Sequence, residues 1–192
     1  MIVPTEREYR NMSAAIEGKE LKNSYTIVRT GVGKALAAAN TAMAVMRAGG
    51  EFDRVAVVGY AASTIGRKRG EVVMPRIARY HDCRIPGDFV PVLTDPHLLI
   101  GHDDMGIWTG DSFVDGEIIA ATKAKYGFTD GLFDMEATAI CQAAELSGDL
   151  PVVVVKMISD IPEEGDTEHS YDEFVNSHSD FSVFVDYFEK LK

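Results

Sequence analysis

The chain alternates between short apolar runs and longer segments in which apolar residues recur at helical spacing. Residues 55–58 and 152–158 consist mostly of Val with Ala, Met and Ile, which is typical of strands buried on both faces of a parallel sheet. Residues 25–29 favour a strand because of their β-branched side chains, and residues 35–48, rich in Ala and Met, favour a helix. Strand, glycine turn, helix and strand in this order predict a βαβ unit and a largely parallel sheet.

The second half of the chain predicts further elements of both kinds. Residues 107–109 are expected to form a strand, and residues 114–125 a helix. Another helix is expected over residues 134–146, with Gly148 at its C-cap. Residues 171–191 place Phe and Val at helical spacing and predict an amphipathic C-terminal helix, bent at its Ser-His-Ser sequence.

The length of 192 residues is sufficient for one domain with a sizeable core. We therefore predict an α/β fold with three layers, α/β/α, around a central mixed, largely parallel sheet, and a single domain over residues 1–192. Residues 59–63 are expected to turn at the carboxyl end of the second strand. Ligands of open α/β sheets bind at this edge, so the polar residues that follow the strands are the candidates for chemistry.

The net charge of −11 limits the classes of partner. The only basic run, residues 67–69, is short and isolated, so neither nucleic-acid nor membrane binding is expected, because both need a positive face. Glu6, Arg7 and Glu8 exclude a signal-peptide pattern at the start, and no apolar run reaches the roughly 20 residues of a membrane span. We expect a cytoplasmic protein.

Four acidic residues follow predicted strands or lie at the start of predicted helices. Asp160 ends the strand of Val residues, where burial would raise the pKa of its carboxyl group and equip it to hold and transfer a proton. The alternative is that Asp160 caps the following loop. Asp134 and Glu136 begin the predicted helix and, taken alone, are best explained as acids that complement its dipole. Glu8, taken alone, is a surface acid on a first helix.

Several common motifs are absent. Residues 31–34 lack the third glycine of a dinucleotide fingerprint and the ending of a P-loop, so close backbone packing is the favoured interpretation. The five histidines form no i,i+4 pair, so no metal and no other cofactor is expected. Neither Ser63 nor Ser112 lies in a G-x-S-x-G sequence, which argues against a hydrolase triad.

Taken together and in order, several stretches resemble the purine nucleoside phosphorylase/nucleosidase superfamily, most closely its methylthioadenosine/S-adenosylhomocysteine nucleosidase branch. These stretches are residues 2–8 (IVPTERE), 30–35 (TGVGKA), 109–114 (TGDSFV), 134–140 (DMEATAI), 152–160 (VVVVKMISD) and 170–174 (SYDEF). The pairing of the Met-Glu-Ala helix with the Ile-Ser-Asp strand end is the specific part of the resemblance.

The resemblance implies hydrolysis of the N-ribosidic bond of a purine nucleoside, such as a 5′-modified adenosine, with release of the free base. Asp160 would protonate N7 of the departing purine. Glu8 would orient and deprotonate a water molecule on the opposite face of the sugar, as the two acids of an inverting glycosidase do. Glu6 is the alternative to Glu8 for this role.

The resemblance also implies the residues that bind substrate. Glu136 would accept hydrogen bonds from the ribose hydroxyls, and Met135 would pack against the sugar. Phe113 would stack on the purine while the Val114 backbone contacts its edge. Tyr171 would line the base or the 5′ side.

The chain departs from the family pattern at several points. Residues 61–65 replace a Gly-Ser-Ala-Gly-Gly turn, so a hydroxyl near the sugar is either lost at Ala62 or displaced to Ser63. Lys156 stands where Arg is usual near the catalytic water. The compact charge of an ammonium group thus replaces the planar guanidinium group, which can form two parallel hydrogen bonds. Asp134 replaces a longer Glu.

Two other functions stay open. A phosphate-dependent nucleoside phosphorylase would need an anion site, for which Arg29 and Arg67 are candidates. A non-catalytic nucleoside-binding protein on the same scaffold would explain the altered turn at residues 61–65. The resemblance also implies a homodimer in which a partner's loop completes the 5′ pocket, with Phe89 and Leu98 as exposed apolar candidates.

Overall fold

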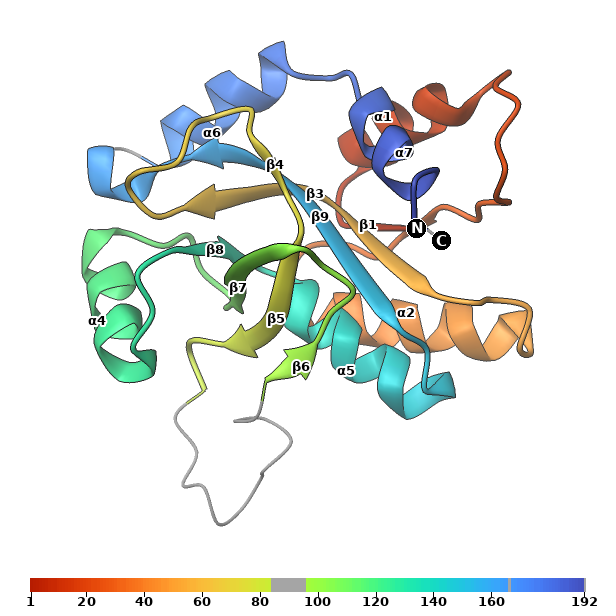
Figure 1. The fold of residues 1–192 in the computed structure, drawn as a ribbon, viewed down its shortest axis with the longest axis horizontal. Coiled ribbons are helices and arrows are strands. Elements are labelled where there is room, and N and C mark those ends of the chain that lie inside the picture. Colours follow the sequence, from red (N-terminus) through yellow and green to blue (C-terminus); the bar gives the residue numbers. More distant parts are fainter. Residues whose placement is uncertain (84–95, 166, 192) are drawn as a thin grey trace.

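The computed structural model describes residues 1–83, 96–165 and 167–191, and within them it contains a nine-stranded sheet with helices on both faces (Figure 1). The strands are β1 (Ile2–Val3), β2 (Val28–Arg29), β3 (Val55–Ser63), β4 (Val72–Val73), β5 (Pro75–Tyr80), β6 (His97–Leu98), β7 (Asp103–Thr109), β8 (Gly131–Asp134) and β9 (Val152–Asp160). The helices are α1 (Glu6–Ile16), α2 (Lys34–Ala48), α4 (Gly116–Tyr126), α5 (Ala137–Gly148), the 3₁₀ helix η1 (Pro162–Glu164), α6 (Thr167–Ser177) and α7 (Ser182–Phe188).

The two long central strands separate two of the three hydrophobic cores, and the third lies around Trp108, Ile119 and Phe133. Successive side chains of a strand point to opposite faces, and in β9 Val154 packs on one side while Val153 and Val155 pack on the other. The first core lies under α2 and α5, and the second lies under α1, α6 and α7 (Figure 1). The predicted three-layer α/β/α fold is therefore confirmed.

The sheet is mixed and largely parallel, as predicted. β3 runs parallel to β9 and to β1, and β7 runs parallel to β5 and β8. At its far end β3 pairs antiparallel with β8, through Ala62 opposite Phe133. The register with β9 shifts between Ala61 and Ala62, where the strand changes neighbours. The carboxyl ends of β3 and β9 therefore lie beside the end of β8.

Two predicted strand boundaries were wrong. The expected turn at residues 59–63 is strand, because β3 continues to pair with β9 as far as Asp160 and then with β8. The strand predicted over residues 25–29 contains only Val28 and Arg29, since only these two residues pair with β1.

Two helix predictions also need correction. The helix expected from residue 134 begins at Ala137, because Asp134 is the last residue of β8 and pairs with Thr109. Its C-cap is Asp149 in the left-handed conformation, and Gly148 is the last helical residue. The expected bent C-terminal helix is two separate helices, α6 and α7, with residues 178–181 between them.

Among the helices of the described ranges, none has both the length and the apolar character required to cross a membrane.

Candidate active site

A cavity of about 270 Å³ opens at the carboxyl ends of β3, β8 and β9. It is bordered by the start of α1 on one side and by Tyr171 of α6 on another. The sequence-predicted residues that line it are Glu8, Ala62, Phe113, Val114, Asp134, Met135, Glu136, Asp160 and Tyr171. Chain segments from both ends of the sequence thus meet around one space.

Glu8 reaches the cavity from the first turn of α1. Thr5 and Glu8 form a capping box: the Glu8 amide donates to Thr5 Oγ1 at 3.2 Å, and the Thr5 amide donates to Glu8 Oε2 at 3.0 Å. Glu8 is only 2% exposed, so its interpretation as a surface acid was wrong. Burial raises the pKa of the Glu8 carboxyl group, and the Thr5 hydroxyl and the charge of Lys156 oppose that rise.

Glu6, the alternative to Glu8, lies on the outer surface of α1. Its carboxylate is about half exposed and forms ion pairs with Arg10, at 2.9 Å, and with Arg29. Of the two N-terminal glutamates, only Glu8 therefore faces the cavity.

Asp160 enters the cavity from the end of β9. Its Oδ1 accepts a hydrogen bond from the Ser159 hydroxyl at 2.6 Å, whereas its buried Oδ2 has no partner within the described residues. Burial raises the pKa of this carboxyl group from its ordinary 3.8 to about 6. The alternative that Asp160 caps the following loop was wrong, because Ile161 occupies the N-cap of η1. A buried oxygen with a free lone pair, on a carboxyl group that titrates near neutral pH, is suited to proton transfer.

Glu136 is held at the opposite wall by the glycine turn that follows β2. Its Oε1 accepts a hydrogen bond from the Gly33 amide at 2.9 Å. Gly33 has φ +91°, a conformation that favours glycine. Burial, together with the charge of Asp134, raises the pKa of Glu136 to about 7. Its other carboxylate oxygen is available to a ligand hydroxyl.

Asp134 lines the cavity and forms a buried ion pair with Lys156 behind it. Their Nζ and Oδ2 atoms are 3.0 Å apart, and both side chains are almost fully buried. Burial lowers the pKa of Lys156, but the charges of Asp134, Glu136 and Glu8 raise it more, so the amine stays protonated. Asp134 also accepts a hydrogen bond from the Ala137 amide at 2.9 Å, at the start of α5. The interpretation that this acid interacts with the start of the helix is therefore correct.

Ser63 and Lys156 do not line the cavity, although both lie next to residues that do. The Ser63 hydroxyl is buried and directed at the carbonyl of Gly131, 3.5 Å away. Ala62 occupies the wall, so the hydroxyl that the family pattern has near the sugar is not displaced to Ser63.

Aromatic side chains form the remaining wall. Phe113, 45% exposed, meets Tyr171 edge to face with ring centroids 5.7 Å apart. Tyr171 in turn meets Tyr60, at 6.2 Å. Tyr60 and Thr5 also line the cavity, and neither was singled out from the sequence. The T-x-x-E spacing of Thr5 and Glu8 is a capping-box signal that would have found Thr5.

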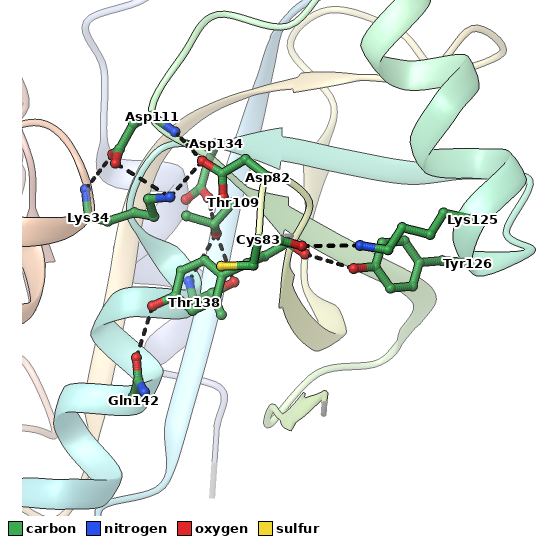
Figure 2. Close-up of polar contacts among 11 residues, drawn as sticks. Lys34, Asp82, Cys83, Thr109, Asp111, Lys125, Tyr126, Asp134, Thr138 and Gln142 are labelled. Carbon is green, nitrogen blue, oxygen red and sulfur yellow. Dashed lines mark hydrogen bonds and ion pairs between the residues drawn. The ribbon is translucent and has the colours of Figure 1, made fainter. Parts of the chain in front are cut away.

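Polar contacts join the segments that follow β5 and β7 to the start of α2 (Figure 2). Lys34 Nζ lies 2.5 Å from Asp82 and 3.4 Å from Asp111, and the Lys34 amide donates to Asp111 at 2.9 Å. The Thr109 hydroxyl donates to Asp134 at 2.7 Å and accepts from the Thr138 hydroxyl at 2.8 Å. The glycine turn and the ends of β5 and β7 are thereby joined.

Basic side chains are absent from the part of the cavity wall that the described residues form. Arg29 pairs with Glu6 on the surface, and Arg67 pairs with Asp130 and with Glu71 at 2.7 Å. Within residues 1–83, 96–165 and 167–191, no group of three or more His, Cys, Asp or Glu side chains is arranged to hold a metal ion.

A family model described as the phosphorylase superfamily matches residues 4–184. Among solved structures, the fold is similar to a methylthioadenosine/S-adenosylhomocysteine nucleosidase from Neisseria meningitidis in complex with methylthio-immucillin-A, with a TM-score of 0.80 and 22% identity over 99% of this chain and 97% of that one. A nucleosidase of the same name from Colwellia psychrerythraea, in complex with adenine, gives 0.78 and 23% over 98% and 92%. One from Helicobacter pylori gives 0.79 and 16% over 98% and 95%. No curated protein matches the sequence. At these identities the structural likeness establishes the fold.

Proposed function

Since the chain belongs to the phosphorylase superfamily, we propose that it is a hydrolase that cleaves the N-ribosidic bond of a purine nucleoside and releases the free base. The observation that carries the proposal is that the carboxyl groups of Glu8 and Asp160 border the same cavity. Glu8 comes from the first helix and Asp160 from the last long strand. Two acids that reach one space from separate elements can act on the two sides of one bond.

Cleavage of a ribosidic bond builds positive character on the sugar and negative charge on the departing base. Asp160, whose pKa burial raises to about 6, would donate its proton to N7 of the purine. Glu8 would orient a water molecule and accept its proton as the water attacks the anomeric carbon. The proton balance closes, since one acid gives a proton to the base while the other takes one from water.

The remaining wall residues would bind the nucleoside. The free oxygen of Glu136 would accept from the ribose hydroxyls, and Met135 would pack on the sugar. Phe113 is exposed enough for its face to stack on a purine, with Tyr171 at its edge. The Val114 backbone lies beside Phe113 and would contact the base edge.

Water is the favoured nucleophile. A phosphorylase needs cationic groups for its phosphate, and the two candidates, Arg29 and Arg67, are paired with carboxylates away from the cavity. Lys34, next to the glycine turn, is likewise held by Asp82 and Asp111. The amide of Gly33, which could bind an anion, already donates to Glu136.

A 5′-modified adenosine such as methylthioadenosine or S-adenosylhomocysteine is the proposed substrate. The similar nucleosidases were solved with adenine and with methylthio-immucillin-A, which supports an adenine base and a sulfur-bearing 5′ group.

We also propose that the whole chain is one such domain and acts as a cytoplasmic homodimer. Val32 lines the cavity and is about half exposed, and Leu36, Met43 and Met46 continue an exposed apolar surface along α2. A second copy on this surface would adjoin the cavity. Leu98 is 80% exposed, whereas Phe89 lies outside the described residues.

The test is base release from methylthioadenosine, adenosine and inosine, each with and without phosphate. Release that does not depend on phosphate is expected. Strict dependence on phosphate would make the protein a phosphorylase, and tight binding without release would make it a nucleoside-binding protein. Light scattering of the same sample gives the oligomeric state.

A further inference from the structure

The carboxylate of Glu8 is fixed at each of its two oxygens by a different part of the molecule. Oε2 accepts from the amide and the hydroxyl of Thr5, at 3.0 and 2.6 Å, so the start of α1 holds this oxygen. Oε1 lies over the backbone of Gly59, in the middle of β3. The capping box accounts for the first contact, and the second depends on the sequence of a distant strand.

Gly59 leaves open the space that Oε1 occupies. A Cβ atom built at this position would overlap Oε1 of Glu8 and would lie 3.3 Å from its Cδ. Gly59 also has φ +146°, which disfavours residues with a side chain. Any other residue at position 59 would therefore displace the Glu8 carboxylate or shift β3.

Lys156 faces the same space from the neighbouring strand. Gly59 of β3 and Lys156 of β9 are directly opposite in the parallel register. The same Cβ position at residue 59 would lie 3.9 Å from Lys156 Nζ, so the amine and the Glu8 carboxylate both border the gap. Asp134 fixes the amine from its other side, at 3.0 Å.

We propose that Gly59 and Lys156 are positioning residues that seat the Glu8 carboxylate, Gly59 by having no side chain and Lys156 by facing the carboxylate with a positive charge. The proposal deepens the proposed function, because it takes Glu8 as the group that activates water. This placement of the Glu8 carboxylate over Gly59 and next to Lys156, called the seat below, is a geometric feature. It can be tested without measuring turnover.

The first test is a double-mutant cycle read by thermal unfolding. Gly59→Ala should lower Tm, and the loss should shrink clearly in a Glu8→Ala background, because the added methyl group then meets no carboxylate. Some loss remains because of φ at residue 59. Gly116→Ala is the matched control, since an added Cβ there meets nothing within 4 Å, and its effect should be the same in both backgrounds. An equal loss for Gly59→Ala in both backgrounds would overturn the seat, whether or not the protein is an enzyme.

The second test is kinetic. Gly59→Ala should lower kcat by roughly 10²-fold, while KM changes little, because the displaced group activates water and does not bind the nucleoside. Gly116→Ala should keep both constants. A Gly59→Ala variant with wild-type kcat would contradict the proposal. A wild-type protein without activity on any nucleoside refutes the proposed function instead, and the thermal cycle still decides the seat.

The role of Lys156 is tested by the pH profile of kcat. The groups around Glu8 that influence it are Lys156 from β9, Tyr60 from β3, Tyr171 from α6 and Glu136 before α5. Lys156 is the cation among them. Lys156→Met should therefore move the acidic limb of the profile to higher pH, and Lys156→Arg should restore it. If the Lys156→Met protein is folded and its acidic limb stays in place, the role of the Lys156 charge is refuted. A purely structural role of the side chain would not move this limb.

Discussion

The exchange of Asp160 for Asn is expected to remove activity and to stabilise the protein at the same time. Asp160 is 2% exposed, and burial raises the pKa of its carboxyl group from 3.8 to about 6. A group that binds its proton more tightly in the folded state stabilises the fold below its unfolded pKa, and this contribution is lost as the pH rises through the folded pKa. At pH 8 the ionised carboxylate therefore costs the fold up to about 3 kcal/mol.

An asparagine side chain has nearly the same shape and no charge, so the Asp160→Asn substitution removes this cost. The Ser159 hydroxyl can still donate to the amide oxygen, as it does now to Oδ1 at 2.6 Å. We expect the free energy of unfolding at pH 8 to rise by up to about 3 kcal/mol, which corresponds to a gain in Tm of up to roughly 10 °C for a chain of this size. Near pH 3.5 the wild-type carboxyl group is mostly protonated in both states, and the two proteins should differ much less in stability.

The assay combines urea unfolding at both pH values with base release from methylthioadenosine. The Asp160→Asn substitution should lower kcat by roughly 10²- to 10⁴-fold, because the proton donor is lost. In the wild type, kcat/KM should fall as pH rises through about 6, where Asp160 loses its proton. Asp172→Asn, at an exposed position of α6, is the matched control and should change neither property. Full turnover by the Asp160→Asn variant, or a loss of its stability at pH 8, would refute the reasoning.

Three further predictions concern other residues. Phe113→Ala should raise KM by roughly tenfold with little change in kcat, since it removes one stacking face; an unchanged KM in steady-state kinetics would exclude Phe113 from binding. Glu8→Gln should lower kcat by roughly 10²-fold, whereas Glu6→Gln, on the exposed face of the same helix, should leave kcat unchanged; equal effects of the two would argue against Glu8 as base. Asp149→Gly should raise the free energy of unfolding by about 0.5–1 kcal/mol in urea titrations, because Asp149 is the C-cap of α5 at φ +50°; a loss of stability would mean that its side chain contributes more than the strain costs.

The layers of the fold could be predicted because they depend on local patterns. The Val-rich run of β9 and the Ala- and Met-rich helix α2 are each recognisable from their own residues. Local patterns do not predict the ends of an element where pairing between distant strands determines them. Residues 59–63 are small and resemble a turn, but two neighbouring strands extend β3 through them. Asp134 resembles a helix start, but pairing with β7 makes it the end of a strand.

The site shows the same division. The position of Asp160 at the end of a Val-rich strand indicates an acid at the edge where open α/β sheets bind ligands. The helix places Glu8 on one face with the apolar Met12 and Ala15. The accommodation of a buried carboxylate on that face could not be read from the helix. It depends on Gly59, Lys156 and Tyr60, which belong to strands far away in the sequence. The buried ion pair of Lys156 with Asp134 likewise joins residues of two different strands, β9 and β8.

The contacts of Lys34 with Asp82 and Asp111 have a consequence for affinity (Figure 2). They fasten the loop that presents the Gly33 amide, and through it Glu136, before any ligand arrives. If Glu136 binds the sugar as proposed, a nucleoside would meet this contact already in place, and the entropy cost of ordering the loop would be part of folding and not of binding. Loosening Lys34 would therefore weaken binding without removing a single atom that touches the ligand.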